Sequence, residues 1–302
     1  MVKSLVLENI SVGFKLPQGV FYAVDDVSLN LQGGNFTAII GESGCGKSVL
    51  GQAILNILPS GVVKKGRVLY NGEQVKKILS AFGIIPQNPS ESLNPVRKIG
   101  KQMQDILAVH NITDGDNSYK KQCLRLFGLQ EAERVLAAYP HELSGGMLQR
   151  VLCAMAVSSK PEWILADEPT KGLDEQVGAV VRKNLLTIKQ DLHLSMLIIT
   201  HDIALAQEVC DDVLVMYAGQ VLEHNADIWH KPLHPYTKGF LQALPKNGLQ
   251  VIPGKAPVPG ESFTGCKFAA RCPYCTTRCK EEKPAMQQVG NAEVRCFLYA
   301  EG

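Results

Sequence analysis

Long apolar runs and any strong excess of charge are missing from this sequence. No apolar run approaches the ~20 residues that a membrane-spanning helix needs, which excludes a helical integral membrane protein. Residues 1–14, MVKSLVLENISVGF, lack the basic and apolar segments of a signal peptide, so we expect no secretion. The 31 basic and 29 acidic residues leave a net charge of +2, which does not indicate nucleic acid as a partner. We therefore expect a soluble cytoplasmic protein, which could still dock on a membrane protein.

Cysteine is sparse over most of the chain and crowded at its end. Cys45, Cys123, Cys153 and Cys210 are scattered, whereas the other five cysteines lie in the last 37 residues. Internal repeats and low-complexity tracts are absent. In a chain without a secretory signal, a terminal cysteine cluster indicates a metal site rather than disulfides.

Short aliphatic runs alternate with helical patterns, which predicts an α/β fold. The runs at 36–41, 163–167 and 195–200 read as strands of a parallel sheet, because they are apolar on both faces. The helical patterns lie at 47–58, 145–158 and 175–191. Residues 213–224 predict a hairpin around Ala218-Gly219, and the opening segments predict an antiparallel sheet beside the main one.

Two regions depart from this alternation. Residues 88–158 have helical spacing and little strand character, which predicts a helical insertion. After Asn225 the chain becomes rich in proline and glycine, which indicates linkers and a small irregular domain. We therefore predict a main domain at 1–232, with a helical subdomain at about 88–158, and a cysteine-rich extension at 233–302.

A phosphate-binding loop is predicted at 41–48, GESGCGKS, which fits G-x-x-x-x-G-K-[ST] between a strand and a helix. The glycines allow backbone N–H groups to point at phosphate oxygens, and the helix adds a positive dipole end. Lys47 is expected to reach the β- and γ-phosphates of ATP, and Ser48 to bind Mg²⁺. The predicted nucleotide contacts in this segment are Gly41, Glu42, Ser43, Gly44, Cys45, Gly46, Lys47, Ser48 and Val49. A plain glycine-rich turn with a chance lysine is the alternative.

Two acidic residues end the apolar run WILAD-E at 163–168. Asp167 is expected to hold Mg²⁺, and Glu168 to polarise the water that attacks the γ-phosphate. A solvated turn would also explain adjacent acids at a strand end.

The segment LSGGMLQR at 143–150 resembles the signature motif of ATP-binding cassette (ABC) ATPases. Ser144 suits a helix N-cap, and Gly145 and Gly146 leave N–H groups open at a positive helix end. This would be a second phosphate-binding surface, which two subunits meeting head to tail would use for each other's γ-phosphate. The signature residues predicted to bind nucleotide are Ser144, Gly145, Gly146 and Gln149.

The resemblance covers nearly the whole chain and implies further roles. Gln87 matches the Q-loop residue that senses Mg²⁺ and the attacking water, and Asp174 matches the D-loop at the dimer interface. His201 matches the switch histidine that contacts the γ-phosphate, so the implied catalytic residues are Glu168, His201 and Gln87. Tyr22 and Phe14 are both candidates for stacking on adenine. The implied fold is that of a P-loop ABC ATPase with a mixed sheet, an antiparallel β subdomain and a helical insertion.

Within ABC proteins, the chain resembles the peptide and nickel importers. The segments YPHELSGGMLQR and HPYTKGFLQALP carry this likeness, and the cargo predicted is peptides or nickel. The resemblance implies a second homologous ATPase subunit (as a hetero- or homodimer), two membrane permease subunits and, indirectly, an extracellular binding protein. It implies a place at the cytoplasmic face of a prokaryotic membrane. The alternative is a soluble ABC ATPase that acts on ribosomes or DNA, or a pure scaffold.

The terminal cysteines resemble the pattern that holds a four-iron four-sulfur cluster in peptide importers. The implied ligands are Cys266, Cys272, Cys279 and Cys296, with Cys275 as a possible substitute. A structural zinc site with four cysteines, or a tail with free thiols, are the alternatives. Cys45, where the family often has serine, is either a neutral filler or a thiol that oxidation could use to block the loop.

Overall fold

The structure is a computed structural model that describes residues 4–17, 19–74, 81–244, 250–258 and 261–300. The chain divides into two compact units. Unit 1 comprises residues 1–2, 33–36 and 76–209, and unit 2 comprises residues 3–32, 37–75 and 210–302. Among the described residues, no helix is both long and apolar enough to cross a membrane.

Unit 1 contains a parallel sheet with the order β8-β7-β6. Its strands are β6 (Phe82–Ile85), β7 (Trp163–Asp167) and β8 (Ser195–Ile199). The two predicted strands, β7 and β8, are confirmed, whereas β6 was not predicted because its four residues are too few to show a pattern. Nearly every residue of β7 and β8 is buried, which explains why they are aliphatic on both faces.

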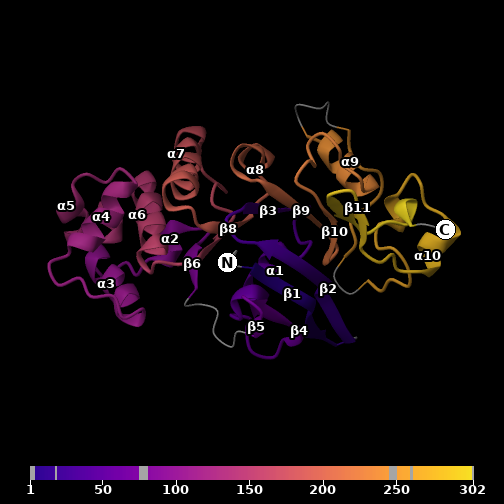
Figure 1. Ribbon diagram of the computed structural model, residues 1–302, viewed down its shortest axis with the longest axis horizontal. Helices are drawn as coiled ribbons and strands as arrows, with labels where there is room; N and C mark the ends of the chain where they lie inside the picture. Colours follow the sequence, from indigo (N-terminus) through magenta and orange to yellow (C-terminus); the bar gives the residue numbers. More distant parts are fainter. Residues whose placement is uncertain (1–3, 18, 75–80, 245–249, 259–260, 301–302) are drawn as a thin grey trace. The chain divides into compact units, whose positions relative to one another are not determined.

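Helices make up much of the rest of unit 1, and those between residues 99 and 158 lie together in the magenta region of Figure 1. The helices are α2 (Pro89–Ser92), α3 (Ile99–Val109), α4 (Ser118–Leu126), α5 (Ala132–Ala137), α6 (Gly145–Ser158), α7 (Glu175–Thr187) and α8 (Ile203–Val209). Short turns of 3-10 and π helix lie at Pro140–Glu142 and Ile188–Leu192. Helix α6 packs against α2, α3, α4, α7 and β6, which is why it is apolar on most of its surface. Residues 88–158 contain α2 to α6 joined by turns, which agrees with the predicted helical insertion.

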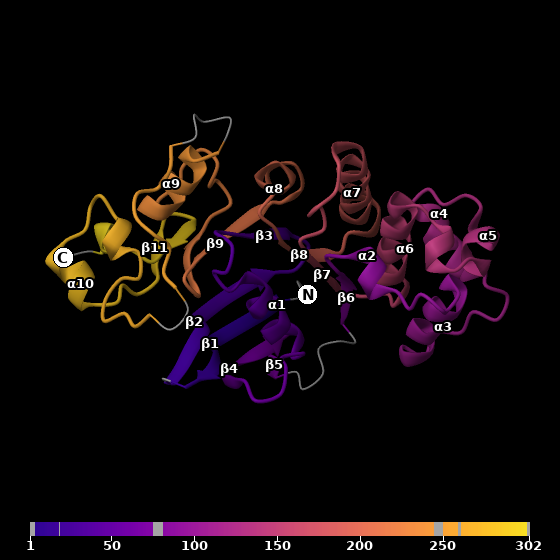
Figure 2. The same ribbon diagram turned by 180° about the vertical axis from the view of Figure 1, so that it is seen from behind.

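Unit 2 contains an antiparallel sheet with the order β2-β1-β4-β5, seen in indigo and violet in Figure 2. The strands are β1 (Ser4–Leu16), β2 (Gly19–Gln32), β4 (Val63–Tyr70) and β5 (Glu73–Gln74). The alternation of β2 between buried and exposed positions shows that one face of this sheet packs on the core. The predicted antiparallel sheet is therefore confirmed.

A second sheet of unit 2 places the phosphate loop. It includes β3 (Phe36–Ile40), β9 (Asp212–Tyr217), β10 (Gln220–His224), β11 (Gln287–Val289) and β12 (Ala292–Val294). Strand β3 runs parallel to β9, and β9 forms the predicted hairpin with β10. Helix α1 (Lys47–Leu55) follows β3 and ends three residues earlier than predicted, because Asn56 adopts a left-handed conformation with φ of 57°.

The C-terminal region adds short elements to unit 2. These are α9 (Pro235–Gln242), α10 (Thr277–Glu281) and 3-10 turns at Ala269–Arg271 and Phe297–Tyr299. Strand β12 pairs with β10, so the extension continues the sheet that carries the phosphate loop. Residues 245–249 and 259–260 of the extension lie outside the described part.

Candidate functional site

The phosphate loop connects β3 to α1, and at two of its glycines a side chain would be strained and would also collide with neighbouring backbone. Gly41 has φ of 150° and Gly46 has φ of 105°. A Cβ atom on Gly41 would stand 2.1 Å from the Met216 carbonyl oxygen, and one on Gly46 would stand 2.1 Å from that of Ala23. The glycines of the predicted motif therefore allow the loop to lie directly against neighbouring backbone.

Lys47 is the first residue of α1 and is only 7% exposed. Its Nζ atom donates hydrogen bonds to the carbonyl oxygens of Gly41 at 2.8 Å and Glu42 at 3.1 Å. These bonds hold the ammonium group over the loop. The open N-terminus of α1 and this ammonium together supply the donors that a phosphate needs.

Cys45 is buried within the loop and is 6% exposed. Burial raises the pKa of its thiol above the ordinary value, although Lys47 acts in the opposite direction. A neutral, inaccessible thiol is a poor nucleophile, so the geometry favours Cys45 as a filler over Cys45 as an oxidation switch.

The carboxyl edge of the β8-β7-β6 sheet gathers the predicted catalytic residues of unit 1. Asp167 ends β7, and Glu168 follows it with φ of 47°. Gln87 is exposed two residues beyond β6, and His201 comes two residues beyond β8. Parallel strands end at one edge of their sheet, so unrelated parts of the sequence deliver these side chains to one place.

Glu168 and His201 contact each other directly. The Oε2 atom of Glu168 lies 2.6 Å from Nδ1 of His201, and it also accepts the His201 backbone N–H at 3.3 Å. The Glu168 side chain is 12% exposed, whereas the imidazole is 55% exposed. This arrangement fixes the carboxylate and leaves the histidine free to meet a ligand from solvent.

The signature residues occupy the first turn of α6. Ser144 caps the helix, and its hydroxyl oxygen accepts the Met147 N–H at 3.4 Å. A Cβ atom on Gly145 or Gly146 would have no atom of the described residues within 4 Å, so this part of the helix end is uncovered there. Gln149 is buried, and its amide donates to the carbonyl oxygen of Pro169 at 3.4 Å; Pro169 follows Glu168 in the sequence.

Asp174, the predicted D-loop residue, is exposed and caps α7 by accepting the Val177 N–H at 2.9 Å.

Tyr22 lines a cavity of about 340 Å³ in unit 2 together with Gly44 of the phosphate loop. Phe14, which pairs with Phe21 across β1 and β2, is not among the residues that line this cavity. The structure thus places Tyr22, of the two candidate aromatic residues, beside the loop. Residues of the extension, including Phe263 and Lys267, form another wall of the same cavity.

Four of the terminal cysteines line one cavity of about 170 Å³, namely Cys266, Cys272, Cys279 and Cys296. Cys275 does not line it, and its thiol lies 3.5 Å from the Thr276 carbonyl oxygen. Burial raises the pKa of Cys266 to about 11, and it raises the pKa of Cys272 and Cys296 as well. Within the described residues, no three His, Cys, Asp or Glu side chains come close enough together to hold a metal ion. The predicted cysteine-bound metal centre is therefore not established.

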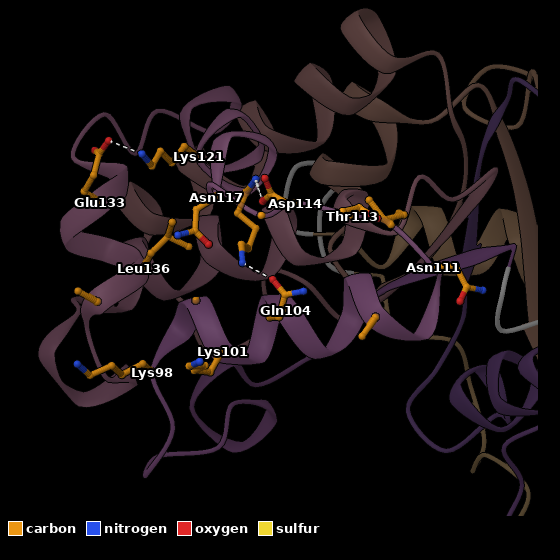
Figure 3. Close-up of a pocket in the computed structure, with 16 residues that line it drawn as sticks. Lys98, Lys101, Gln104, Asn111, Thr113, Asp114, Asn117, Lys121, Glu133 and Leu136 are labelled. Carbon is orange, nitrogen blue, oxygen red and sulfur yellow. Dashed lines mark hydrogen bonds and ion pairs between the residues drawn. The ribbon is translucent and has the colours of Figure 1, made fainter.

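A further cavity, of about 1010 Å³, lies among the helices of unit 1 and contains none of the predicted site residues (Figure 3). Two of its lysines have partners within the cavity lining: Lys121 pairs with Glu133 at 3.1 Å, and Lys120 donates to the Gln104 side chain at 2.5 Å. We assign it no part in nucleotide binding.

Comparison with known proteins identifies the family. Residues 24–171 match the family model described as ABC transporter, and residues 222–279 match that described as oligopeptide/dipeptide transporter, C-terminal region. The chain is 34% identical to the oligopeptide transport ATP-binding protein OppD of Haemophilus influenzae, covering 98% of each chain. It is 36% identical to the dipeptide transport ATP-binding protein DppD of Escherichia coli, covering 95% of this chain and 94% of the relative. This chain belongs to the ABC transporter ATP-binding proteins. It is accordingly an ATPase of the kind coupled to transport.

Solved structures agree with the fold of an ABC ATP-binding protein. The cassette MJ0796, in a dimeric post-hydrolysis state bound to ADP and Pi, has a TM-score of 0.61 at 24% identity, covering 73% of this chain and 97% of that one. The protein cbiO1 of Clostridium perfringens has a TM-score of 0.62 at 26% identity, covering 74% and 89%. The predicted P-loop ABC fold is confirmed.

Sequence reasoning missed two residues that contact the phosphate loop of this ABC protein. Arg271 forms an ion pair with Glu42 at 3.1 Å, and the Tyr236 hydroxyl accepts the Glu42 N–H at 3.1 Å. Tyr236 lies in the segment HPYTKG, which the family resemblance had singled out without a role. Nothing in the local sequence around Arg271 signals its contact with a residue 229 positions away.

Proposed function

We propose that this chain is the ATP-hydrolysing subunit of an importer that takes up peptides across the cytoplasmic membrane. The observation that carries this proposal is the similarity over nearly the full length to ATP-binding proteins named for oligopeptide and dipeptide transport, including the C-terminal region. Nickel, the other cargo suggested by the resemblance, has no counterpart among these relatives. These relatives also do not favour a soluble ATPase that acts on ribosomes or DNA.

The proposed chemistry is positioning and charge neutralisation around ATP and Mg²⁺. The phosphate loop and Lys47 would bind the phosphates, and Ser48 and Asp167 would hold Mg²⁺. Gln87 would contact Mg²⁺ and the attacking water. Glu168 polarises the attacking water. His201, held by Glu168 at 2.6 Å, contacts the γ-phosphate.

The signature surface suggests that two subunits meet head to tail. Ser144, Gly145 and Gly146 leave the N-terminus of a 14-residue helix open. Such a helix end attracts a phosphate, and the partner's ATP would supply one. The partner is a homologous chain or a second copy.

A groove of about 440 Å³ in unit 1 is suited to a helix of a permease subunit. Strand β6, the segment after it, α3 and α6 line it, with Leu93, Ile106 and Leu152 among its apolar residues. Ile84, which also lines it, is 38% exposed. An amphipathic helix with its apolar side in this groove would link this ATPase chain to one of the two permease subunits, and its partner chain would bind the other. The permease would in turn meet an extracellular binding protein.

The substitution Glu168→Gln tests the catalytic assignment. It keeps the size of the side chain but removes its negative charge, so we expect ATP hydrolysis to fall by at least about 100-fold. ATP binding should remain, and an ATP-bound dimer should accumulate on size-exclusion chromatography. Unchanged turnover in this variant would contradict the role of Glu168. Co-purification with ribosomes or DNA instead of a permease would support the soluble alternative.

We also propose that Cys266, Cys272, Cys279 and Cys296 hold a four-iron four-sulfur cluster. Their shared cavity supports this assignment. A single zinc ion needs four sulfurs about 2.3 Å from one point, whereas a cluster holds its thiolates further apart.

Metal analysis of protein purified without oxygen tests the cluster. We expect about four iron and four sulfide per chain, since each cysteine binds one iron. Cys272→Ser should lower the iron content, whereas Cys275→Ser, which changes a thiol outside the cavity, should not. A colourless protein with one zinc and no iron would disprove the cluster.

A further inference from the structure

Glu42, the second residue of the phosphate loop, is held by the C-terminal extension through both its backbone and its side chain. Its N–H donates to the Tyr236 hydroxyl oxygen at 3.1 Å. Its two carboxylate oxygens each accept a hydrogen bond from Nη1 of Arg271 at 3.1 Å. Both partners come from the extension, which an ABC fold does not need in order to form the loop itself.

Arg271 is anchored on several sides. Its side chain is 7% exposed, and its Nε atom donates to the Pro253 carbonyl oxygen at 3.1 Å. Its Nη1 atom also donates to the Tyr217 hydroxyl at 3.3 Å, and its guanidinium lies 5.7 Å from the centre of the Tyr217 ring. Burial lowers the pKa of Arg271, but Glu42 and Tyr217 outweigh burial and hold it above its ordinary value. These partners restrict the Arg271 guanidinium to one position. Because the Glu42 carboxylate is hydrogen-bonded to this guanidinium, its position is restricted as well.

The Tyr236 hydroxyl is equally well placed. The tyrosine is fully buried at the start of α9, where His234 caps the helix by accepting the Tyr236 N–H at 3.0 Å. Its ring lies 4.6 Å from that of Tyr217 and 5.5 Å from that of Phe268. Packed rings define the hydroxyl position closely, so the Glu42 N–H has a fixed acceptor.

The position of Glu42 in turn decides where Lys47 rests. The carbonyl oxygens of Gly41 and Glu42 are the two backbone acceptors of the Lys47 ammonium, at 2.8 and 3.1 Å. Any shift of Glu42 would therefore move the group that meets the phosphates. The contacts form a continuous path from Arg271 and Tyr236 through Glu42 to Lys47.

We propose that Arg271 and Tyr236 are positioning residues of the ATP site, through which the C-terminal extension holds the phosphate loop in its nucleotide-binding conformation. This inference rests on the proposed role of the loop in binding ATP. The competing explanation is that Arg271 only fastens the extension to the sheet and that Glu42 only neutralises its charge. The two explanations differ in whether ATP affinity depends on the pair.

A double-mutant cycle separates them. Binding of a non-hydrolysable ATP analogue with Mg²⁺ is measured by calorimetry on the full purified chain for Arg271→Gln, Glu42→Gln and the double variant. Each single change should weaken binding about tenfold, which equals about 1.4 kcal/mol. The double variant should be no weaker than either single one, because the two side chains act as one unit. In steady-state hydrolysis, KM for ATP should rise while kcat at saturating ATP stays near the wild-type value.

Two further variants complete the test. Glu282→Gln breaks an exposed ion pair with Arg278 on the same extension and should bind the analogue like the wild type. Tyr236→Phe removes only the hydroxyl and should weaken binding by several-fold, which keeps the test decisive if Arg271→Gln fails to fold.

Opposite outcomes would overturn the inference. Wild-type affinity in both Glu42→Gln and Tyr236→Phe would do so, as would a double variant about a hundredfold weaker, since that shows two independent roles. If the wild-type chain does not bind the analogue, the proposed ATPase function is contradicted, and this inference, which depends on it, is contradicted as well.

Discussion

Gly46 illustrates how one residue controls the nucleotide site. Its φ of 105° lies in the left-handed region, and the Ala23 carbonyl oxygen stands where a Cβ atom would be, at 2.1 Å. Gly44 shares the left-handed conformation, with φ of 80°, but a Cβ atom there would meet nothing within 4 Å. A side chain at Gly44 would therefore suffer only backbone strain, whereas a side chain at Gly46 would suffer the same strain and a collision with backbone as well.

The pair Gly46→Ala and Gly44→Ala tests this distinction. Gly44→Ala should cost roughly 1–2 kcal/mol of folding free energy, the ordinary penalty for a left-handed side-chain residue. Gly46→Ala must also displace backbone, so it should cost more and weaken ATP binding by at least about tenfold. Urea unfolding and calorimetric ATP titration of both variants give the two quantities. Equal losses in the two variants would show that the close approach is unimportant.

At the scale of the elements, the extension is fastened to the sheet by a histidine between two carboxylates. His224 of β10 contacts Asp212 of β9 through Nε2, and Glu293 of β12 through Nδ1 at 3.0 Å. Only a protonated imidazole can donate to both carboxylates. Burial lowers the pKa of His224, but Asp212 and Glu293 outweigh burial and raise it above its ordinary value of 6.5.

The sign of the pH dependence follows from this shift. Because the pKa of His224 is higher in the folded state than in the unfolded state, its contribution is complete below pH 6.5. The contribution is lost as the pH rises through the folded-state pKa. The difference in unfolding free energy between the wild type and His224→Gln should therefore be largest near pH 6 and shrink towards pH 9.

Urea titrations across this pH range measure the difference. His230→Gln is the control, because its imidazole is 81% exposed and forms an exposed pair with Asp227 at 2.9 Å. An exposed pair of this kind contributes about 0–1 kcal/mol. A His224→Gln difference that grows with pH would contradict the assignment.

For the whole molecule, the open N-terminus of α6 predicts that a single chain is an incomplete enzyme. Among the described residues, nothing lies within 4 Å of a Cβ position on Gly145 or Gly146, and in the proposed head-to-tail arrangement the phosphate at this helix end comes from another molecule. Turnover per chain should then rise with chain concentration, or with addition of the homologous partner.

Complementation gives a sharper measurement of this prediction. Chains carrying Glu168→Gln and chains carrying Ser144→Arg should each hydrolyse ATP slowly, whereas their mixture should recover activity. One mixed dimer then combines an intact Glu168 with an intact signature from the other chain. Full turnover by Ser144→Arg alone, independent of concentration, would contradict the head-to-tail arrangement.

The sequence by itself determined the parts of this protein that depend on neighbouring residues. Three such parts are short contiguous segments: the loop at 41–48, the acidic pair Asp167 and Glu168 at the end of β7, and the N-cap of α6. In each, neighbouring side chains and backbone groups act together. The α/β alternation, the helical insertion and the β9–β10 hairpin were likewise predictable, because burial imposes its period on adjacent residues.

Only the tertiary structure decided the matters that depend on distant residues. Packing of unit 2 placed Tyr22 rather than Phe14 in the cavity beside the loop, and the turns of the extension left Cys275 outside the cysteine cavity. The contact of Arg271 with Glu42 joins positions 229 apart, and no local pattern encodes which distant carboxylate a buried arginine will meet. Such pairings are selected by packing of the whole unit, which brings together segments that are independent of each other in the chain.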